Sequence, residues 1–192
     1  MSINSIKENF KDAQRLLDAF IADQNNWDNM KAAGDMMVDC LKSGGKIISC
    51  GNGGSMSDAM HFAEELSGRF RDDRKGLAAI AISDPTHITC VANDYGFDYI
   101  FSRYVEAVGK NGDVLLAIST SGNSANVLRA AQEACKKGMK VIALTGKDGG
   151  KIKDNCDVEL RIPHFKYSDR IQELHIQIIH SFIQYIELEY FK

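Results

Sequence analysis

The sequence predicts an α/β protein: a three-layer α/β/α sandwich with a central parallel sheet, preceded by a helical extension at the N-terminus. The first observation is a set of five short apolar runs, most of which end in turn residues, and the second is a set of helix-length amphipathic segments between those runs. Short strands that alternate with helices indicate a parallel sheet covered on both faces. The five predicted strands are residues 46–50, 78–82, 114–118, 141–144 and 158–162.

The N-terminal extension is predicted to contain two helices. In the first helix, apolar residues from Ile6 to Phe20 recur at helical spacing, and the second covers residues 27–41 and stops before Gly44 and Gly45. A chain of 192 residues can form one core, and neither a linker nor a repeat divides it. We therefore expect one domain over residues 1–192, with N-terminal helices over about 1–44 and the α/β core over about 45–192.

Helices are predicted between the strands and at the C-terminal end of the chain. They cover residues 58–66, 100–108 and 125–137, with one long helix over about 169–190. Ligands of parallel sheets bind beyond the carboxyl ends of the strands. We therefore expect the chemistry in the loops that follow Cys50, Ile82, Ile118 and Leu144.

Composition and charge argue against nucleic acid and membranes as binding partners of this chain. The net charge is -3, so the chain has no basic field of the kind that attracts nucleic acid or an anionic membrane. The five cysteines are odd in number and lack a CxxC spacing, which predicts free, buried thiols in a reducing compartment. No apolar run reaches transmembrane length. We expect a cytoplasmic protein with neither nucleic acid nor a membrane as its partner.

The glycine-rich loop at residues 51–55 (GNGGS) precedes a predicted helix. Glycines let a ligand approach the backbone, and a helix N-terminus favours an anion. The loop lacks the Lys of a Walker A motif, and Met56 stands where a dinucleotide fingerprint needs glycine. An equally simple interpretation is a tight turn in which Ser55 caps the helix and Asp58 completes a capping box. Taken alone, this loop favours the turn.

The serine-rich loop at residues 119–124 (STSGNS) predicts a phosphate site. Its four hydroxyls and the N-terminus of the following helix can donate to the oxygens of a phosphate monoester. The alternative is a turn with Ser124 as N-cap. Since a helix needs one cap rather than four hydroxyls, the phosphate site is favoured.

Two pairs of residues on predicted helices are candidate chemical groups. His61 and Glu65 are four apart and share a helix face, so they can bind a metal or orient a base, although such pairs are more often surface hydrogen bonds. Gln172 and His180 are eight apart in the last helix, which is apolar enough to be largely buried. Asp169 can cap that helix with Gln172 closing a capping box.

A further polar segment, residues 93–96 (NDYG), is predicted as a loop. Asp94 there can accept sugar hydroxyls, and turn chemistry explains the segment equally well. His87, His164 and His175 show no partner at a useful spacing, and no role is assigned to them.

Taken together, these segments resemble the sugar isomerase (SIS) domain and, within it, the phosphoheptose isomerase family. The stretches that carry the resemblance are CGNGGSMSDAMHFAEELSGRF, AISDPTHITCVANDYGF, ISTSGNSANV, LTGKDGG and SDRIQELHIQIIH. The pattern GNGGSxxDAxHFAxE followed by STSGNS is highly specific, and the resemblance covers nearly the whole chain. It implies a homotetramer whose active sites combine residues of more than one subunit.

The resemblance also implies roles for individual residues. Glu65 and His180 would be the catalytic acid/base pair. His61, Glu65, Gln172 and His180 would bind one zinc ion per subunit. The sequence leaves open whether zinc is required for turnover. The substrate-binding residues would be Asn52, Gly53, Gly54, Ser55, Glu65, Asn93, Asp94, Ser119, Thr120, Ser121, Ser124, Asp169 and Gln172.

The implied reaction is the aldose–ketose isomerisation of sedoheptulose 7-phosphate to D-glycero-D-manno-heptose 7-phosphate through an enediol. This reaction is the first step of ADP-heptose synthesis for the lipopolysaccharide core. The alternative is a non-catalytic SIS-domain regulator that binds sugar phosphates, or an adaptor that binds proteins. Such a protein needs the phosphate site but not Glu65 and His180 together. A pentose or hexose phosphate isomerase is a second alternative, because the residues do not reveal the length of the sugar.

Overall fold

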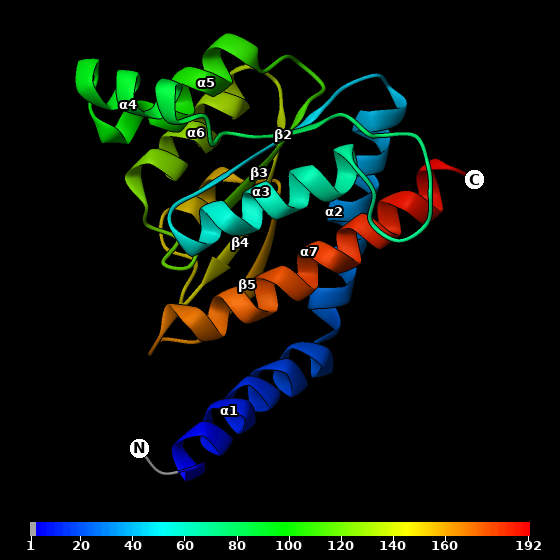
Figure 1. Cartoon of the computed structure of the whole chain (residues 1–192), viewed down its shortest axis with the longest axis vertical. Helices are drawn as coiled ribbons and strands as arrows, with labels where there is room; N and C mark the ends of the chain where they lie inside the picture. Colours follow the sequence, from blue (N-terminus) through cyan, green and yellow to red (C-terminus); the bar gives the residue numbers. More distant parts are fainter. Residues whose placement is uncertain (1–2) are drawn as a thin grey trace.

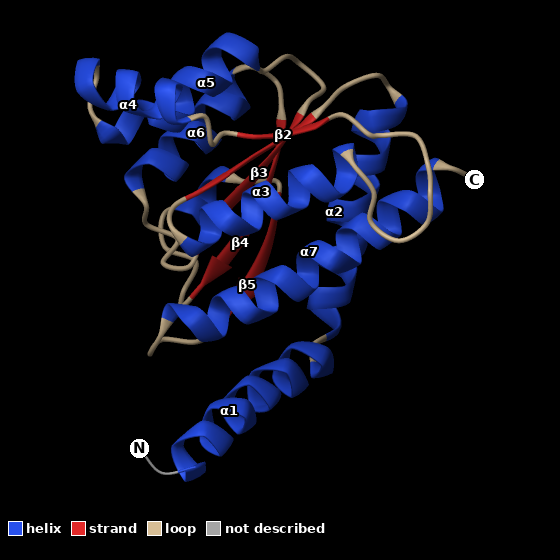
Figure 2. Ribbon diagram, viewed as in Figure 1, coloured by secondary structure: helices blue, strands red, loops and turns tan. Residues whose placement is uncertain are grey.

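A five-stranded parallel sheet forms the centre of the computed structural model, which describes residues 3–192. The strand order is β2-β1-β3-β4-β5, and every neighbouring pair is parallel. Figure 2 shows the strands enclosed by helices. The strands are β1 (Ile47–Gly51), β2 (Ala79–Ala81), β3 (Val114–Ser119), β4 (Lys140–Gly146) and β5 (Val158–Ile162). The predicted parallel α/β fold is therefore confirmed.

Two helical layers cover the sheet, and each closes its own apolar core. Along β3, Val114, Leu116 and Ile118 enter one core while Leu115 and Ala117 enter the other, as the alternation of a strand requires. The helices α2 (Gln24–Lys42), α3 (Gly54–Ser67) and α7 (Ser168–Tyr190) complete the first core. The helices α4 (Pro85–Asp94), α5 (Ile100–Val108) and α6 (Ala125–Lys136) complete the second (Figure 1).

The N-terminal helix α1 (Ile3–Ala22) extends away from the α/β body (Figure 1). None of its residues is buried, and the apolar Ile3, Ile6 and Phe10 are exposed. Asp23 separates α1 from α2 and caps α2, with its side chain accepting a hydrogen bond from the Asn25 N–H. The two predicted N-terminal helices are thus present, and the assignment of residues 1–192 to a single domain stays a prediction.

Helix α4 corrects the sequence analysis. Its last two residues, Asn93 and Asp94, were predicted to lie in a loop, but they form the final helical turn, and Tyr95 is the C-cap. The start of α4 carries a clear signal, because Asp84 accepts a hydrogen bond from the His87 N–H at 2.8 Å and Pro85 begins the helix. Two short 3-10 helices, η1 (Phe97–Tyr99) and η2 (Ile152–Asn155), complete the structure.

The cysteines agree with the prediction only in part. All five are free thiols, and Cys40 and Cys50 are buried. Cys90 and Cys135, however, are exposed, because each lies on the outer face of a helix that buries only one side.

Among the described helices, none is long and apolar enough to cross a membrane.

His175 fastens α7 to the sheet. Its side chain is fully buried, and its Nε2 lies 2.9 Å from the carbonyl oxygen of Thr145 in β4, so Nε2–H is the donor. Burial lowers the pKa of His175 to about 4, and the hydrogen bond to Thr145 opposes that shift. His175 is therefore a neutral core residue at physiological pH.

This burial predicts an acid-sensitive fold. Between pH of about 6.5 and about 4 the unfolded chain binds a proton at His175 and the folded chain does not, so stability falls as the pH falls. We expect His175 to contribute a loss of about 1 kcal/mol in the free energy of unfolding per pH unit in that window.

Urea denaturation of the wild type and of His175→Gln across this window measures the effect. The variant is less stable at pH 7, and its stability depends less steeply on pH. The control is His87→Gln, at a half-buried histidine on α4, which keeps the wild-type slope. Equal slopes for His175→Gln and the wild type would contradict the prediction.

Candidate active site

The candidate site lies where the order of the strands in the sheet changes direction, between β1 and β3. From β1 the chain continues to β2 on one side and later to β3 on the other, so the loops after β1 and β3 diverge at one edge. Gly51 at the end of β1 is in register with Ile118 of β3. The two loops are joined directly, because the side-chain amides of Asn52 and Asn126 exchange two hydrogen bonds of 2.9 Å.

The loop after β3 forms a hydroxyl-lined candidate cradle for an anion at the N-terminus of α6. Ser119 is 3% exposed, and its Oγ lies 3.0 Å from Ser124 Oγ and 3.5 Å from Ser121 Oγ. Ser124 occupies the N-cap position, but its side chain makes no capping hydrogen bond. The alternative of a simple capping serine is therefore not what the structure shows. The hydroxyls point to one another rather than to the helix, and an anion at this N-terminus would receive their hydrogen bonds.

The backbone geometry of the loop after β3 requires glycine at position 122. Gly122 has φ +63°, and a Cβ atom on it would lie 2.0 Å from the carbonyl oxygen of Gly149 in the loop after β4. Only glycine allows the two loops to approach this closely. Thr120 Oγ1 donates to Ser168 Oγ at 3.3 Å, which brings the start of α7 to the same edge.

The loop after β1 differs from its predicted capping arrangement. The N-cap of α3 is Gly53, with φ +56° and no side-chain cap, so Ser55 is a buried residue of the first turn and Asp58 lies a turn later. The predicted Ser55 cap and its capping box are wrong because the helix begins before Ser55. Gly54 lies directly against the start of α7, since a Cβ there would lie 2.5 Å from the side-chain nitrogen of Gln172.

The start of α7 also differs from its predicted capping box. Tyr167 is the N-cap without a side-chain cap, and Asp169 lies in the first turn. Asp169 instead accepts a 2.9 Å hydrogen bond from the Arg170 N–H and forms an ion pair with the Arg170 side chain. The Gln172 amide contacts Gly54, so the loops after β1 and β3 and the start of α7 meet at one end of the molecule.

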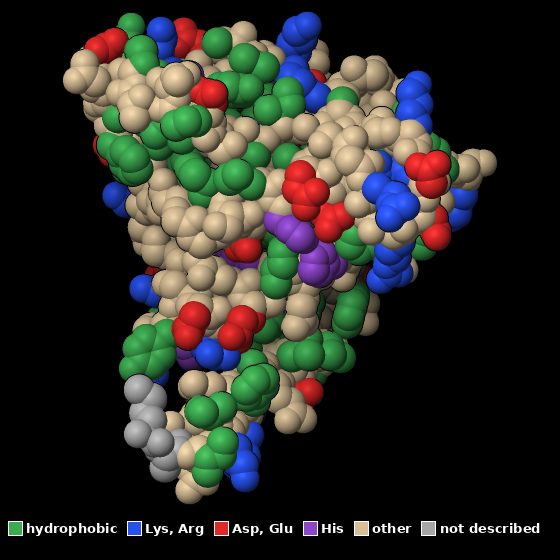
Figure 3. All heavy atoms as spheres, in the orientation of Figure 1, with side chains coloured by type: hydrophobic (Ala, Val, Ile, Leu, Met, Phe, Trp, Pro, Cys, Tyr) green, Lys and Arg blue, Asp and Glu red, His purple; other side chains and the backbone are tan. Residues whose placement is uncertain are grey.

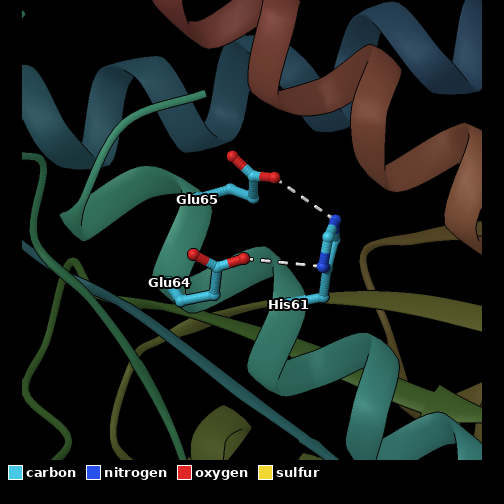
Figure 4. Close-up of side chains that lie close together, drawn as sticks. All are labelled: His61, Glu64 and Glu65. Atoms are coloured by element: carbon cyan, nitrogen blue, oxygen red, sulfur yellow. Dashed lines mark ion pairs between the residues drawn. The ribbon is translucent and has the colours of Figure 1, made fainter. Parts of the chain in front are cut away.

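The second part of the candidate site lies where α3 and α7 pack side by side (Figure 1). His61 Nε2 is 3.0 Å from His180 Nε2 of α7 and 3.4 Å from Glu65 Oε1. Figure 4 shows the two ring nitrogens of His61 directed to Glu64 and Glu65, one to each. The structure thus brings Glu65 and His180 to the same nitrogen atom, and on this face histidine and acidic side chains gather at the surface (Figure 3).

The ligand atoms of His61 and Glu65, together with those of Glu64, all lie within 4.8 Å of one another, which suits a metal ion, and His180 adjoins them through His61 Nε2. Two ligand atoms on a tetrahedral zinc ion with bonds of about 2.0–2.1 Å are about 3.3 Å apart. The observed separations of 3.0 Å and 3.4 Å around His61 Nε2 match that value. Two imidazoles and one carboxylate form a donor set typical of catalytic zinc. Gln172 is not among them, because its amide lies beside Gly54, about two helical turns before His61. Its role as a ligand stays a prediction.

Two carboxylates beside this cluster were not singled out as site residues from the sequence. Glu64 Oε1 lies 3.5 Å from His61 Nδ1, and the spacing of three residues was the available signal. Asp58 is three residues before His61, and its Oδ2 is buried with no hydrogen-bond partner among the described residues. Burial raises the pKa of Asp58 to about 6, and the charge of His61 opposes that shift.

The remaining predicted residues, Asn93 and Asp94, lie apart from both parts in sequence and bond mainly to each other. Asn93 Nδ2 donates to Asp94 Oδ1 at 2.8 Å, and Cys90 Sγ lies 3.6 Å from the other oxygen of Asp94. Their role in substrate binding stays a prediction.

The fold and the two-part site define a sugar-phosphate-binding protein of the SIS class. Residues 8–146 match the SIS domain family. Over 184 residues, covering 96% of both chains, the sequence is 61% identical to the phosphoheptose isomerase of Aeromonas salmonicida.

Solved structures agree. The phosphoheptose isomerase of Francisella tularensis superposes with a TM-score of 0.93 at 38% identity, covering 98% of this chain and 100% of that one. That of Neisseria gonorrhoeae gives a TM-score of 0.84 at 43% identity over 97% and 96% of the two chains. The chain belongs to the phosphoheptose isomerase family, as the motifs predicted, and it is an isomerase.

Proposed function

We propose that the protein interconverts sedoheptulose 7-phosphate and D-glycero-D-manno-heptose 7-phosphate, the first step of ADP-heptose synthesis for the lipopolysaccharide core. The observation that carries the proposal is the meeting of Glu65 and His180 at His61, in a chain that also has an anion cradle. A regulator would need the cradle alone. The family membership of the chain favours the enzyme over the regulator.

The proposed chemistry moves a proton between C1 and C2 of the open-chain sugar. Glu65, with a side chain 17% exposed, removes the proton from one carbon and returns it to the other. His180 exchanges a proton with the carbonyl and hydroxyl oxygens, since an imidazole both donates and accepts. Ser119, Ser121 and Ser124 hold the phosphate at the far end and fix the reacting carbons.

Zinc is the metal that the cluster would hold. His61 Nε2, His180 Nε2 and Glu65 would bind it, with Gln172 of a second subunit as the proposed fourth ligand, since the Gln172 of the same chain lies beside Gly54. When bound, the ion supplies a Lewis acid for the carbonyl and enediolate oxygens. Glu65 has a second carboxylate oxygen, and that oxygen is the proposed base.

The proposed active site combines two subunits. Gly54 at the cradle end of α3 and Glu65 at its other end are eleven residues apart, which is about 16 Å of helix. The seven bonds from C2 to the phosphorus of a heptose 7-phosphate span at most about 10 Å, at about 1.5 Å each. This separation supports a site in which one chain provides the cradle and another provides Glu65. The exposed apolar residues of α1 support an assembly, which we propose to be the homotetramer.

We also propose that the enzyme works in the cytoplasm. The proposal is supported by the five free thiols, which suit a reducing compartment.

The role of Glu65 is tested by Glu65→Gln. The amide has the same shape but no basic oxygen, so turnover falls at least about a hundredfold while sugar-phosphate binding is retained. NMR of the reaction with sedoheptulose 7-phosphate and calorimetric binding measure the two effects. The control is Glu133→Gln, at a partly buried glutamate of α6 that pairs with Lys136, and it retains full turnover. Normal turnover by Glu65→Gln would remove this carboxylate from the chemistry.

Zinc is tested by chelation. We expect turnover to fall more than about tenfold in metal-stripped protein and to return with added zinc, because a Lewis acid contributes several kcal/mol to such a reaction. Metal content is measured by mass spectrometry alongside the rate. His61→Gln is the comparison, and its residual activity no longer responds to zinc. Full activity in fully stripped protein would show that zinc has no Lewis-acid role.

The composite site is tested by mixing two impaired subunits at a substrate concentration below the wild-type KM, because the serine variant is expected to raise KM more than it lowers kcat. Glu65→Gln retains a normal cradle, and Ser119→Ala/Ser121→Ala retains a normal Glu65. If each site uses the cradle of one chain and Glu65 of another, co-assembled subunits regain roughly a quarter of wild-type turnover by random pairing. Each variant assembled alone is the control. Mixed assemblies no more active than those controls would place both parts of the site in one chain.

A further inference from the structure

A buried arginine lies in the loop that leaves the C-terminal end of α3. The side chain of Arg74 is 8% exposed, and it is held between the end of α3 and helix α7. A guanidinium carries five N–H donors in a fixed planar fork, so burial requires several acceptors around it. The acceptors that surround Arg74 belong to the two helices that carry the proposed catalytic residues.

On the α3 side, Arg74 satisfies the last carbonyl groups of the helix. Its Nη2 donates to the carbonyl oxygen of Glu65 at 2.6 Å, and its Nη1 donates to those of Leu66 and Gly68 at 2.8 Å each. The final carbonyls of a helix have no partner within the helix, and a positive charge there is favoured by the helix dipole. One of the three carbonyls belongs to the proposed catalytic base itself.

On the α7 side, Arg74 forms an ion pair with Glu187. Its Nε donates to Glu187 Oε1 at 2.7 Å, and the glutamate side chain is 16% exposed. Glu187 follows His180 by seven residues, which is two helical turns along the same face of α7. Arg74 therefore links the backbone of Glu65 to the helix that positions His180.

The same loop also contacts His180 directly. The ring of Phe70, four residues before Arg74, lies 5.8 Å from the His180 ring at a tilt of 31°. The imidazole of His180 is thus enclosed by His61 on one side, at 5.2 Å between ring centroids, and by this loop on another. Release of the loop would loosen the wall that fixes the rotamer of His180.

We propose that Arg74 is a positioning residue for the isomerisation, holding α3 and α7 at the separation at which Glu65 and His180 meet at His61. The inference rests on the proposed function, because it assigns Arg74 to the reaction of that site. Arg74 touches no reacting atom and acts through the Glu65 backbone and through Glu187. Lysine cannot replace it, since one ammonium group cannot reach four acceptors in different directions.

The test replaces Glu187 rather than Arg74, so that the carbonyl groups of α3 keep their donor. Glu187→Ala leaves the Arg74 Nε–H without its partner and frees α7 to shift. We expect kcat to fall about tenfold to a hundredfold, since displacements near 1 Å cost that much. KM stays within about threefold, because the phosphate cradle is at the other end of α3. Glu187→Gln still offers a carbonyl oxygen to Nε and restores most of kcat.

A second buried ion pair provides the matched control. Lys46 Nζ lies 2.5 Å from Asp113 Oδ2, with side chains 18% and 4% exposed, at the amino ends of β1 and β3 and away from the site. Asp113→Asn weakens a buried pair of the same kind and lowers stability without changing kcat. If Asp113→Asn lowers kcat as much as Glu187→Ala at an equal loss of melting temperature, the effect of Glu187 is structural and the positioning role is wrong.

An NMR measurement decides the proposal independently of turnover. In protein labelled with 15N-histidine, the ring nitrogen signals of His61 and His180 are assigned with His61→Gln and His180→Gln. We expect both signals to shift in Glu187→Ala, and to stay unchanged in Glu187→Gln and Asp113→Asn. Wild-type ring signals in folded Glu187→Ala would overturn the positioning role. If Glu187→Ala shows these shifts but the wild-type protein does not isomerise the sugar, the proposed function is wrong. The role of Arg74 in holding α3 and α7 together would then still stand.

Discussion

The packing of α3 against α7 is the contact on which the candidate site depends. His61 and Glu65 come from one helix and His180 from the other, and Phe62 and Phe182 are fully buried in the core that these helices share. Burial of side chains of this size contributes roughly 1.5–3 kcal/mol each. The apolar contact sets how far apart the two helices lie. That separation in turn fixes the distance between His61 on α3 and His180 on α7. The histidine pair is thus a consequence of core packing, and the site is as rigid as that core.

The sheet supplies the second constraint, which is the position of the anion cradle. Parallel strands end at a common edge, and the reversal of direction between β1 and β3 opens the loops there. Glycines at positions 54 and 122 then allow α7 and the loop after β4 to approach. The two constraints act at opposite ends of α3, which is the basis of the proposal that the active site combines two chains.

Much of the fold was predictable, because strands buried on both faces of a parallel sheet appear in the sequence as short continuous apolar runs. All five strands agree with the predicted runs within two residues at either end, and Ile100–Val108 agrees at both ends. Helix α4 was missed because its β-branched residues weaken the helical pattern and Asn93 and Asp94 at its end are typical of turns, although Asp84 and Pro85 mark its start. The capping errors at Ser55 and Asp169 arose because the backbone conformation of Gly53 and Tyr167 decides where each helix begins, and local composition does not reveal it.

The spacing of His61 and Glu65 predicted a shared face, but the contact of His61 with His180 is a tertiary contact between residues 119 apart in sequence. Arg74 gave no signal, since three of its acceptors are main-chain oxygens and the fourth, the Glu187 carboxylate, is 113 residues away in sequence.

The serine-rich cradle has a consequence for the direction of the reaction. Its residues include neither lysine nor arginine, and they would hold the phosphate end of the sugar, which is identical in the ketose and the aldose. An anchor of this kind stabilises both sugars and the intermediate between them to the same extent, so it lowers neither relative to the other. The ratio of the two bound sugars is therefore not biased by the anchor, and, as with any catalyst, the equilibrium between the free sugars stays where solution chemistry puts it. Net flow toward one sugar is then governed by whichever later step withdraws that sugar from the mixture.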